Sequence, residues 1–73
     1  MTLKDLNPGQ QGKVASISTT GAMKRRIMDM GVTPGVVVKV IKVAPLGDPI
    51  EVNVRGYELS LRKDEAAQVQ IER

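Results

Sequence analysis

Residues 44–62, with the sequence APLGDPIEVNVRGYELSLR, decide the fold of this 73-residue chain. From residue 50 to residue 61 every second side chain is apolar, and only Arg55 and Gly56 interrupt the alternation. Alternation on both sides of a two-residue break predicts a β-hairpin. With Arg55 and Gly56 in the turn, one face carries all the large apolar side chains: Ile50, Val52, Val54, Tyr57, Leu59 and Leu61. A slip of one residue would bury Glu51 and Asn53 instead, so the register is strongly specified.

The turn of this hairpin is unusual in its first residue. Gly56 supplies the positive φ that a two-residue hairpin turn requires. Arginine fits the first central position of a type I′ turn poorly. The sequence therefore predicts where the turn lies and leaves its type open.

The composition excludes several kinds of protein. The chain holds no cysteine and no histidine, so disulfide bonds, the usual zinc sites and the usual nucleophile–base pairs are not available. No glycine-rich nucleotide-binding motif occurs. The longest apolar run, residues 36–38, is far shorter than the ~20 residues of a membrane span, and the first residues do not form a secretory segment. We expect one soluble domain over residues 1–73, without catalytic residues and without a cofactor.

Three further strands are predicted outside the hairpin. Residues 12–18 and 68–72 form the first and the last. In residues 12–18 the apolar Val14 and Ile17 are three apart, so both can point inward only if the strand bulges or bends, and Gly12 is the candidate position. Residues 36–43, VVVKVIKV, are apolar on both faces. We expect this strand to be covered on both sides and to bend, so that a different face is buried at each end.

One helix is predicted between the first and second strands. Residues 22–30 carry Met23, Ile27 and Met30 on one side, and Gly31 follows as a residue that ends helices. Near the start of the chain, Leu3 and Leu6 are expected to close one end of the core. The predicted fold class is mainly β, a small SH3-like barrel of about five antiparallel strands with one short helix, because a barrel protects the strand edges that an open sheet exposes.

Charged side chains offer two kinds of candidate site. Asp48, Glu51 and Glu58 are candidate oxygen ligands for a divalent metal ion, although a solvated strand face is the simpler interpretation. Arg25 and Arg26 belong to a basic cluster on the helix, which is either a solvated face or a surface for an acidic partner.

The proline- and glycine-rich loop of residues 44–49 contains one large apolar side chain, Leu46. A stiff loop loses little entropy on binding, so it can present this side chain to a partner. Alternatively, Leu46 folds back and covers the end of the barrel. The sequence leaves both interpretations open.

Four segments of the chain together resemble the FeoA family, small cytosolic proteins of bacterial ferrous-iron uptake with an SH3-like fold. They are the N-terminal Leu3-x-x-Leu6, RRIMDMGVTPG at residues 25–35, APLGDPI at residues 44–50, and RGYELSLRKDEA at residues 55–66. Each segment alone is a weak signal. Their order, and the fact that they span most of the chain, make the resemblance specific.

The resemblance implies a non-enzymatic accessory protein that acts on FeoB, a membrane Fe(II) transporter with a cytosolic GTPase domain. It implies a cytoplasmic protein, recruited to the inner face of the cell membrane and not itself membrane-spanning. From exposure and the family pattern, the expected partner-binding residues are Arg25, Arg26, Leu46, Asp48, Arg55 and Tyr57.

Two alternatives belong to other classes of function. The first is a module that binds or senses a divalent transition metal through Asp48, Glu51 and Glu58, related to the C-terminal domain of iron-dependent repressors. The second is a small basic barrel that binds nucleic acid, for which the net charge of +3 gives weak support. We expect no nucleic-acid partner, because Tyr57 is the only aromatic residue and base stacking needs several.

Overall fold

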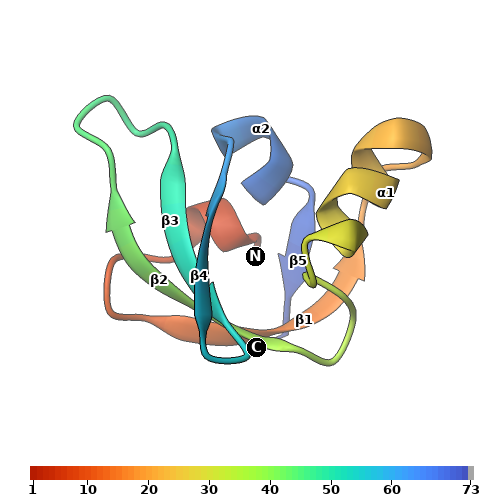
Figure 1. The fold of residues 1–73 in the computed structure, drawn as a ribbon, viewed down its shortest axis with the longest axis horizontal. Helices are drawn as coiled ribbons and strands as arrows, with labels where there is room; N and C mark the ends of the chain where they lie inside the picture. The colour runs from red at the N-terminus through yellow and green to blue at the C-terminus, as the bar shows by residue number, and fades with distance from the viewer. Residues whose placement is uncertain (73) are drawn as a thin grey trace.

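The computed structural model describes residues 1–72 and places five antiparallel strands in one sheet of order β4-β3-β2-β1-β5 (Figure 1). The strands are β1 (Gln11–Ile17), β2 (Val37–Val43), β3 (Ile50–Val54), β4 (Tyr57–Leu61) and β5 (Val69–Ile71). The described residues also form three short helices: η1 (Leu3–Asp5), α1 (Gly21–Asp29) and α2 (Lys63–Ala66). The five-stranded antiparallel arrangement with α1 between the first two strands confirms the prediction.

The β3–β4 hairpin has the predicted register. Val54 pairs with Tyr57, Val52 with Leu59 and Ile50 with Leu61. The three β3 side chains and Leu61 are buried, and Leu59 is partly buried against the same core. Tyr57 is the exception, and the prediction that it is buried was wrong: 48% of its surface is exposed. It lies at the turn end of the hairpin, where its hydroxyl donates a long hydrogen bond of 3.4 Å to the Met30 carbonyl.

Both central residues of the hairpin turn adopt a left-handed backbone, with φ of 52° at Arg55 and 88° at Gly56. Two positive φ angles are the signature of a type I′ turn, whose twist matches that of the strands. The left-handed conformation costs a residue with a side chain about 1–2 kcal/mol. The hairpin therefore tolerates strain at Arg55 that asparagine or glycine would reduce.

Strand β1 pairs with two different neighbours, which curls the sheet. Its first half pairs with β2 and its second half with β5, and the β1–β5 register shifts between Val14 and Ser16. This shift turns both Val14 and Ile17 into the core, as predicted, but it does not lie at Gly12. Gly12 has a different role, because a Cβ atom there would collide with the Ile71 side chain.

Strand β2 is covered on one side only, so the prediction of burial on both faces was wrong. Val38 and Val40 are buried, whereas Val37 and Ile41 are 48% and 37% exposed. The predicted switch of the buried face does occur, near the end of β2 that leads into the loop before β3. The β2–β3 register shifts between Val40 and Lys42, and this bulge brings Val43 against the core.

Helix α1 lies beside the end of β1 and close to β5 (Figure 1). Ile27 is fully buried, and Met23 and Met30 pack against the core from the same side of the helix, as predicted. The helix starts and ends one residue earlier than predicted. Gly31 follows with φ of 96°, and a Cβ atom there would collide with the Tyr57 hydroxyl.

An ion pair joins α1 to α2. Arg26 Nε lies 3.2 Å from Oε2 of Glu65, a carboxylate that is only 4% exposed. The other carboxylate oxygen of Glu65 accepts the Arg62 N–H at 2.9 Å. Both oxygens of this buried group therefore have partners, and removing either partner would leave one of them unsatisfied.

The N-terminal residues cover the outer edge of β5. Thr2 forms a β-bridge with Gln70, and the Met1 carbonyl accepts the Ile71 N–H at 2.9 Å. Leu3 is fully buried, which confirms the prediction that it closes one end of the core. The Thr2 N–H donates to Asp5 at 2.8 Å, and this hydrogen bond lowers the pKa of Asp5 below its usual value. The contact therefore stabilises the folded end above the unfolded pKa of Asp5 and is lost as the pH falls through the folded pKa.

Val52→Asp is expected to unfold the domain. A buried, unpaired carboxylate outweighs the ~3–5 kcal/mol that a core of this size supplies. The matched control is Asn53→Asp, which places the same side chain one residue along on the outer face and should lower the unfolding free energy by less than about 1 kcal/mol. Circular dichroism during urea denaturation measures both, and a folded Val52→Asp variant would contradict the hairpin's place in the core.

Arg26→Met is expected to lower the unfolding free energy by about 1–3 kcal/mol, because it leaves one oxygen of the buried Glu65 carboxylate without a partner. Arg25→Met removes the same group from the neighbouring exposed position and should change stability by less than about 0.5 kcal/mol. Urea denaturation of the two variants compares them directly. Equal losses would mean that the α1–α2 ion pair has no stabilising role.

Candidate interaction surface

The six residues expected to bind a partner do not form one patch. Leu46 and Asp48 lie in the loop between β2 and β3, at the opposite end of the molecule from α1, which carries Arg25 and Arg26 (Figure 1). Arg55 and Tyr57 lie at the tip of the β3–β4 hairpin. Tyr57 contacts the residue after α1, so this tip is connected to the α1 end. The candidate surface therefore has two separate parts.

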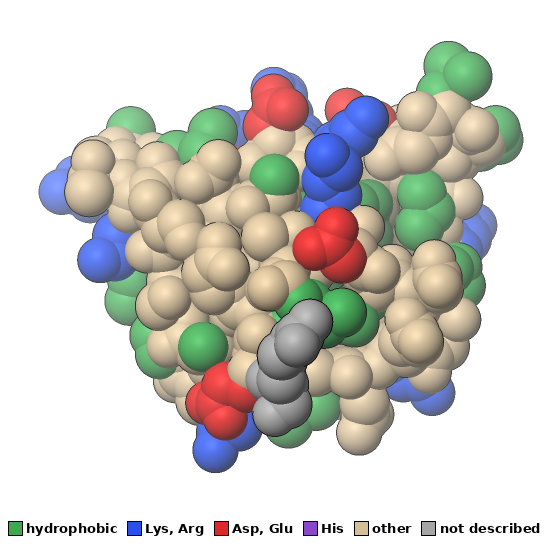
Figure 2. Space-filling view, turned by 180° about the vertical axis from the view of Figure 1, so that it is seen from behind, with side chains coloured by type: hydrophobic (Ala, Val, Ile, Leu, Met, Phe, Trp, Pro, Cys, Tyr) green, Lys and Arg blue, Asp and Glu red, His purple; other side chains and the backbone are tan. Residues whose placement is uncertain are grey.

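The loop between β2 and β3 presents Leu46, which is 93% exposed. The loop is closed on itself, because the Ala44 N–H donates to the Pro49 carbonyl at 3.1 Å and the Gly47 N–H to the Ala44 carbonyl at 2.7 Å. Leu46 does not fold back to cover the barrel, which decides between the two interpretations of the sequence. Viewed from behind, hydrophobic side chains project at the corner that this loop occupies (Figure 2).

Asp48 anchors the same loop to the rest of the protein. Its Oδ1 atom accepts the backbone N–H of Lys63, at the start of α2, at 3.0 Å. This contact across 15 residues of chain holds the base of the loop. Asp48 thus positions Leu46 and keeps a second carboxylate oxygen for other contacts.

The two arginines of α1 have different roles. Arg26 is committed to the buried Glu65, so it holds the helix in place. Arg25 faces solvent and lines a shallow hollow of about 430 Å³ together with Gly21, Lys24, Met28 and Asp29. Sequence reasoning did not predict the burial of Glu65 or its pairing with Arg26. The available signal was half of a capping box, a glutamate three residues after Arg62, whose N–H it accepts.

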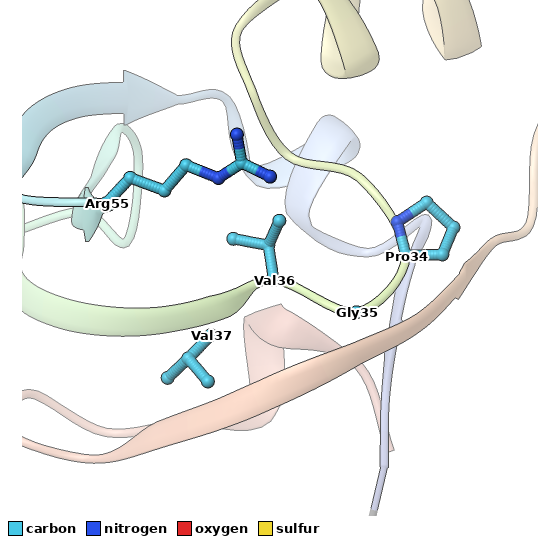
Figure 3. A pocket seen from close by; sticks show the side chains of 5 residues that line it. All are labelled: Pro34, Gly35, Val36, Val37 and Arg55. Carbon is cyan, nitrogen blue, oxygen red and sulfur yellow. The ribbon is translucent and has the colours of Figure 1, made fainter.

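A second hollow, of about 390 Å³, lies between the tip of the hairpin and the turn that leads into β2 (Figure 3). It is lined by Pro34, Gly35, Val36, Val37 and Arg55. The Arg55 side chain reaches across above Val36 and directs its guanidinium group toward Pro34 (Figure 3). Sequence reasoning selected Arg55 but missed the exposed Val37, which it had placed in a covered strand.

The three candidate metal ligands are engaged elsewhere or stand apart. Glu51 Oε2 lies 3.3 Å from Lys42 Nζ, and Asp48 accepts the Lys63 N–H. Glu58 lies opposite Asn53 in the hairpin. Within residues 1–72, no group of three or more acidic, histidine or cysteine side chains is placed to hold a metal ion.

The helices are short. None of those described in residues 1–72 has the length and the apolar character needed to cross a membrane.

Comparison with known proteins gives consistent results. The family model described as FeoA domain matches residues 1–73. A Porphyromonas gingivalis protein described as an Fe(2+) transport protein A/Fe(2+) transporter FeoB fusion protein is 33% identical over 72 residues, which cover 99% of this chain and 8% of that protein. This chain thus spans less than a tenth of that curated relative.

Solved structures agree with the fold. An FeoA-like protein from Clostridium acetobutylicum is 39% identical and superposes with a TM-score of 0.91, covering 99% of this chain and 84% of the other. FeoA of Stenotrophomonas maltophilia, described as an SH3 domain protein and solved with zinc, is 29% identical with a TM-score of 0.85, covering 99% and 89%. The predicted SH3-like fold is confirmed, and the chain belongs to the FeoA family.

Proposed function

We propose that this protein is a non-enzymatic accessory protein of bacterial ferrous-iron uptake, and that it binds the cytosolic GTPase-bearing part of an FeoB-like Fe(II) transporter. The observation that carries the proposal is the Porphyromonas gingivalis fusion protein, in which a segment similar to almost the whole of this chain is part of one polypeptide with FeoB. Covalent linkage of two modules keeps each at a high effective concentration near the other. Two modules that work together benefit from that arrangement.

The proposed docking surface centres on Leu46. A leucine exposed to 93% on a loop that is already closed by its own hydrogen bonds can enter a partner's pocket with little loss of chain entropy. Asp48 holds the base of the loop through the Lys63 N–H. Arg25 supplies charge at the α1 end, while Arg26 fixes the orientation of the helix through Glu65.

The variant with both Leu46→Ala and Arg25→Glu is expected to bind the transporter's cytosolic domain at least about tenfold more weakly, since a buried apolar anchor and a charge contact are each worth 1 kcal/mol or more, on the order of hot-spot values. Titration of the purified cytosolic domain of the FeoB transporter from the same cell measures the Kd. Both substituted residues are exposed, so the variant should keep its thermal stability.

The matched control carries Ile41→Ala with Lys4→Glu. These are also an exposed apolar residue and an exposed cation, but they lie outside the proposed surface. This control should leave the Kd within about twofold of the unchanged protein. An unchanged Kd for the variant at Leu46 and Arg25 would reject the surface, and absence of binding by the unsubstituted protein would reject the function.

A divalent metal is the second candidate ligand, and the observation in its favour is that the Stenotrophomonas maltophilia FeoA was solved with zinc. In this chain the ligands would be oxygens, because it contains neither cysteine nor histidine. Glu51 is the ligand that must exchange a partner, since Lys42 lies 3.3 Å from it.

Calorimetric titration with Fe(II), Mn(II) and Zn(II) tests this candidate. Under the metal-binding hypothesis, Lys42→Met should strengthen binding several-fold, on the order of one lost surface ion pair, because it releases the Glu51 carboxylate. Lys4→Met, which removes an exposed lysine that forms no ion pair with these carboxylates, serves as the control. No heat above that of buffer at millimolar metal would remove the candidate.

A further inference from the structure

The outer face of the sheet carries a row of side chains at the hairpin tip. Lys13 of β1 pairs with Val37 of β2. Val38 pairs with Val54, so Val37 lies opposite the next residue of the hairpin, Arg55. The Arg55 side chain leaves the turn on the other side of β2, above Val36 (Figure 3), so Lys13 is the cation beside the exposed Val37 on the outer face. Lys39 lies two residues along β2 and faces the same side.

None of these three cations is neutralised by an ion pair. In residues 1–72 the ion pairs within 4 Å are Arg26–Glu65 and Lys42–Glu51. The nearest acidic residues in the pairing pattern are Glu58, separated from Lys39 by Asn53, and Glu72, whose N–H donates to the Lys13 carbonyl. The Arg55 side chain extends above Val36 in the direction of Pro34 (Figure 3).

The surface beside Arg55 is concave. The hollow of about 390 Å³ is lined by Pro34, Gly35, Val36, Val37 and Arg55. The guanidinium group lies above Val36, and the Val37 side chain points to the other side of β2 (Figure 3). This volume falls at the small end of the ~300–1000 Å³ typical of sites that take a compact ligand group. The hollow thus combines apolar walls with one positively charged, planar group able to pair with a carboxylate through two hydrogen bonds.

The backbone at Arg55 is strained, which is a second observation, independent of the hollow, that favours a binding role. The turn places this residue at φ of 52°, a conformation that asparagine and glycine adopt more easily. The fold does not need an arginine at this position, since the side chain makes no ion pair in the described residues. Residues with strained backbones cluster at ligand-binding sites, and the side chain of this one lines a hollow.

We propose that this hollow binds a short acidic segment of a partner protein. A carboxylate of the segment pairs with the Arg55 guanidinium, and an adjacent apolar side chain packs on Val36 and Pro34. Lys13 and Lys39, on the outer face of the sheet, add longer-range attraction. The concave shape favours a side chain over a flat bilayer surface. The inference deepens the proposed docking function, and rests on it only in taking the occupant to be part of a protein.

The test is a titration of the full chain, labelled with ¹⁵N, with the acetylated and amidated peptide Glu-Leu-Asp-Glu. Amide shifts should change at Lys13, at residues 35–39 and at residues 55–57. Arg55→Asn should raise the Kd about tenfold or more, the value of a lost charge-assisted contact. The same variant should be at least as stable as the original, since asparagine suits the turn, so lost binding cannot be attributed to unfolding.

Three controls separate this site from general attraction. Lys4→Asn removes one positive charge at an exposed position that does not line the hollow, and should leave the Kd unchanged. Arg55→Lys keeps the charge but not the paired hydrogen bonds and should give an intermediate Kd. The peptide Gln-Leu-Asn-Gln should cause no shifts at the hollow at the same concentrations.

Several results would overturn the proposal. Equal weakening by Lys4→Asn and Arg55→Asn would indicate general charge attraction, and equal binding of Gln-Leu-Asn-Gln would indicate an apolar contact alone. Sedimentation with phosphatidylglycerol vesicles that depends on Arg55, without peptide-induced shifts, would identify a lipid surface instead. Transporter binding that survives Arg55→Asn, together with no peptide-induced shifts, would remove this subsite and leave docking through Leu46 in place.

Discussion

The inward packing of β3 is the constraint on which the rest of the structure depends. Val52 and Val54 are fully buried, and β3 is hydrogen-bonded to β2 on one side and to β4 on the other. The parity of this one strand therefore fixes which residues of both neighbours face the core. Val38 and Val40 meet it from β2, and Leu61 belongs to the strand that meets it from β4. In a chain of 73 residues that forms no disulfide bond, few other apolar contacts exist to compensate for an error in this packing.

The ends of the sheet show how so small a core is enclosed. Strand β1 divides its pairing between β2 and β5, and the first two residues of the chain cover the outer edge of β5. Helix α1 is fastened by Ile27 in the core and by the ion pair between Arg26 and Glu65. These contacts hold the core together without using the side chains of Leu46 and Arg55, although the segments that carry them are themselves fixed through Asp48 and Tyr57. The proposed docking groups, Leu46 and Arg55, are therefore side chains that do not contribute to the core.

Membership of the FeoA family and the placement of the exposed side chains both support the proposed function, which is binding to a transporter. The proposed contacts use exposed side chains, and a fold by itself does not fix a function. Leu46 offers an apolar anchor, whereas Arg55 and its neighbouring lysines offer positive charge beside an apolar hollow. The two lie on different parts of the molecule, so a single partner would have to reach around the barrel or meet only one of them. This separation gives each region its own experimental test.

The sequence by itself determined the elements whose signals are local. Strict alternation specified the β3–β4 register, and the apolar stripe with Gly31 specified α1 within one residue, because neighbouring side chains decide these features. The family resemblance also rested on contiguous segments. Tertiary structure alone decided what depends on distant partners: the positions of the register shifts in β1 and β2, the burial of Glu65 against Arg26, and the exposure of Tyr57 and Leu46. The burial of a side chain depends on which distant segment packs over it, and the local spacing of apolar residues does not specify that segment.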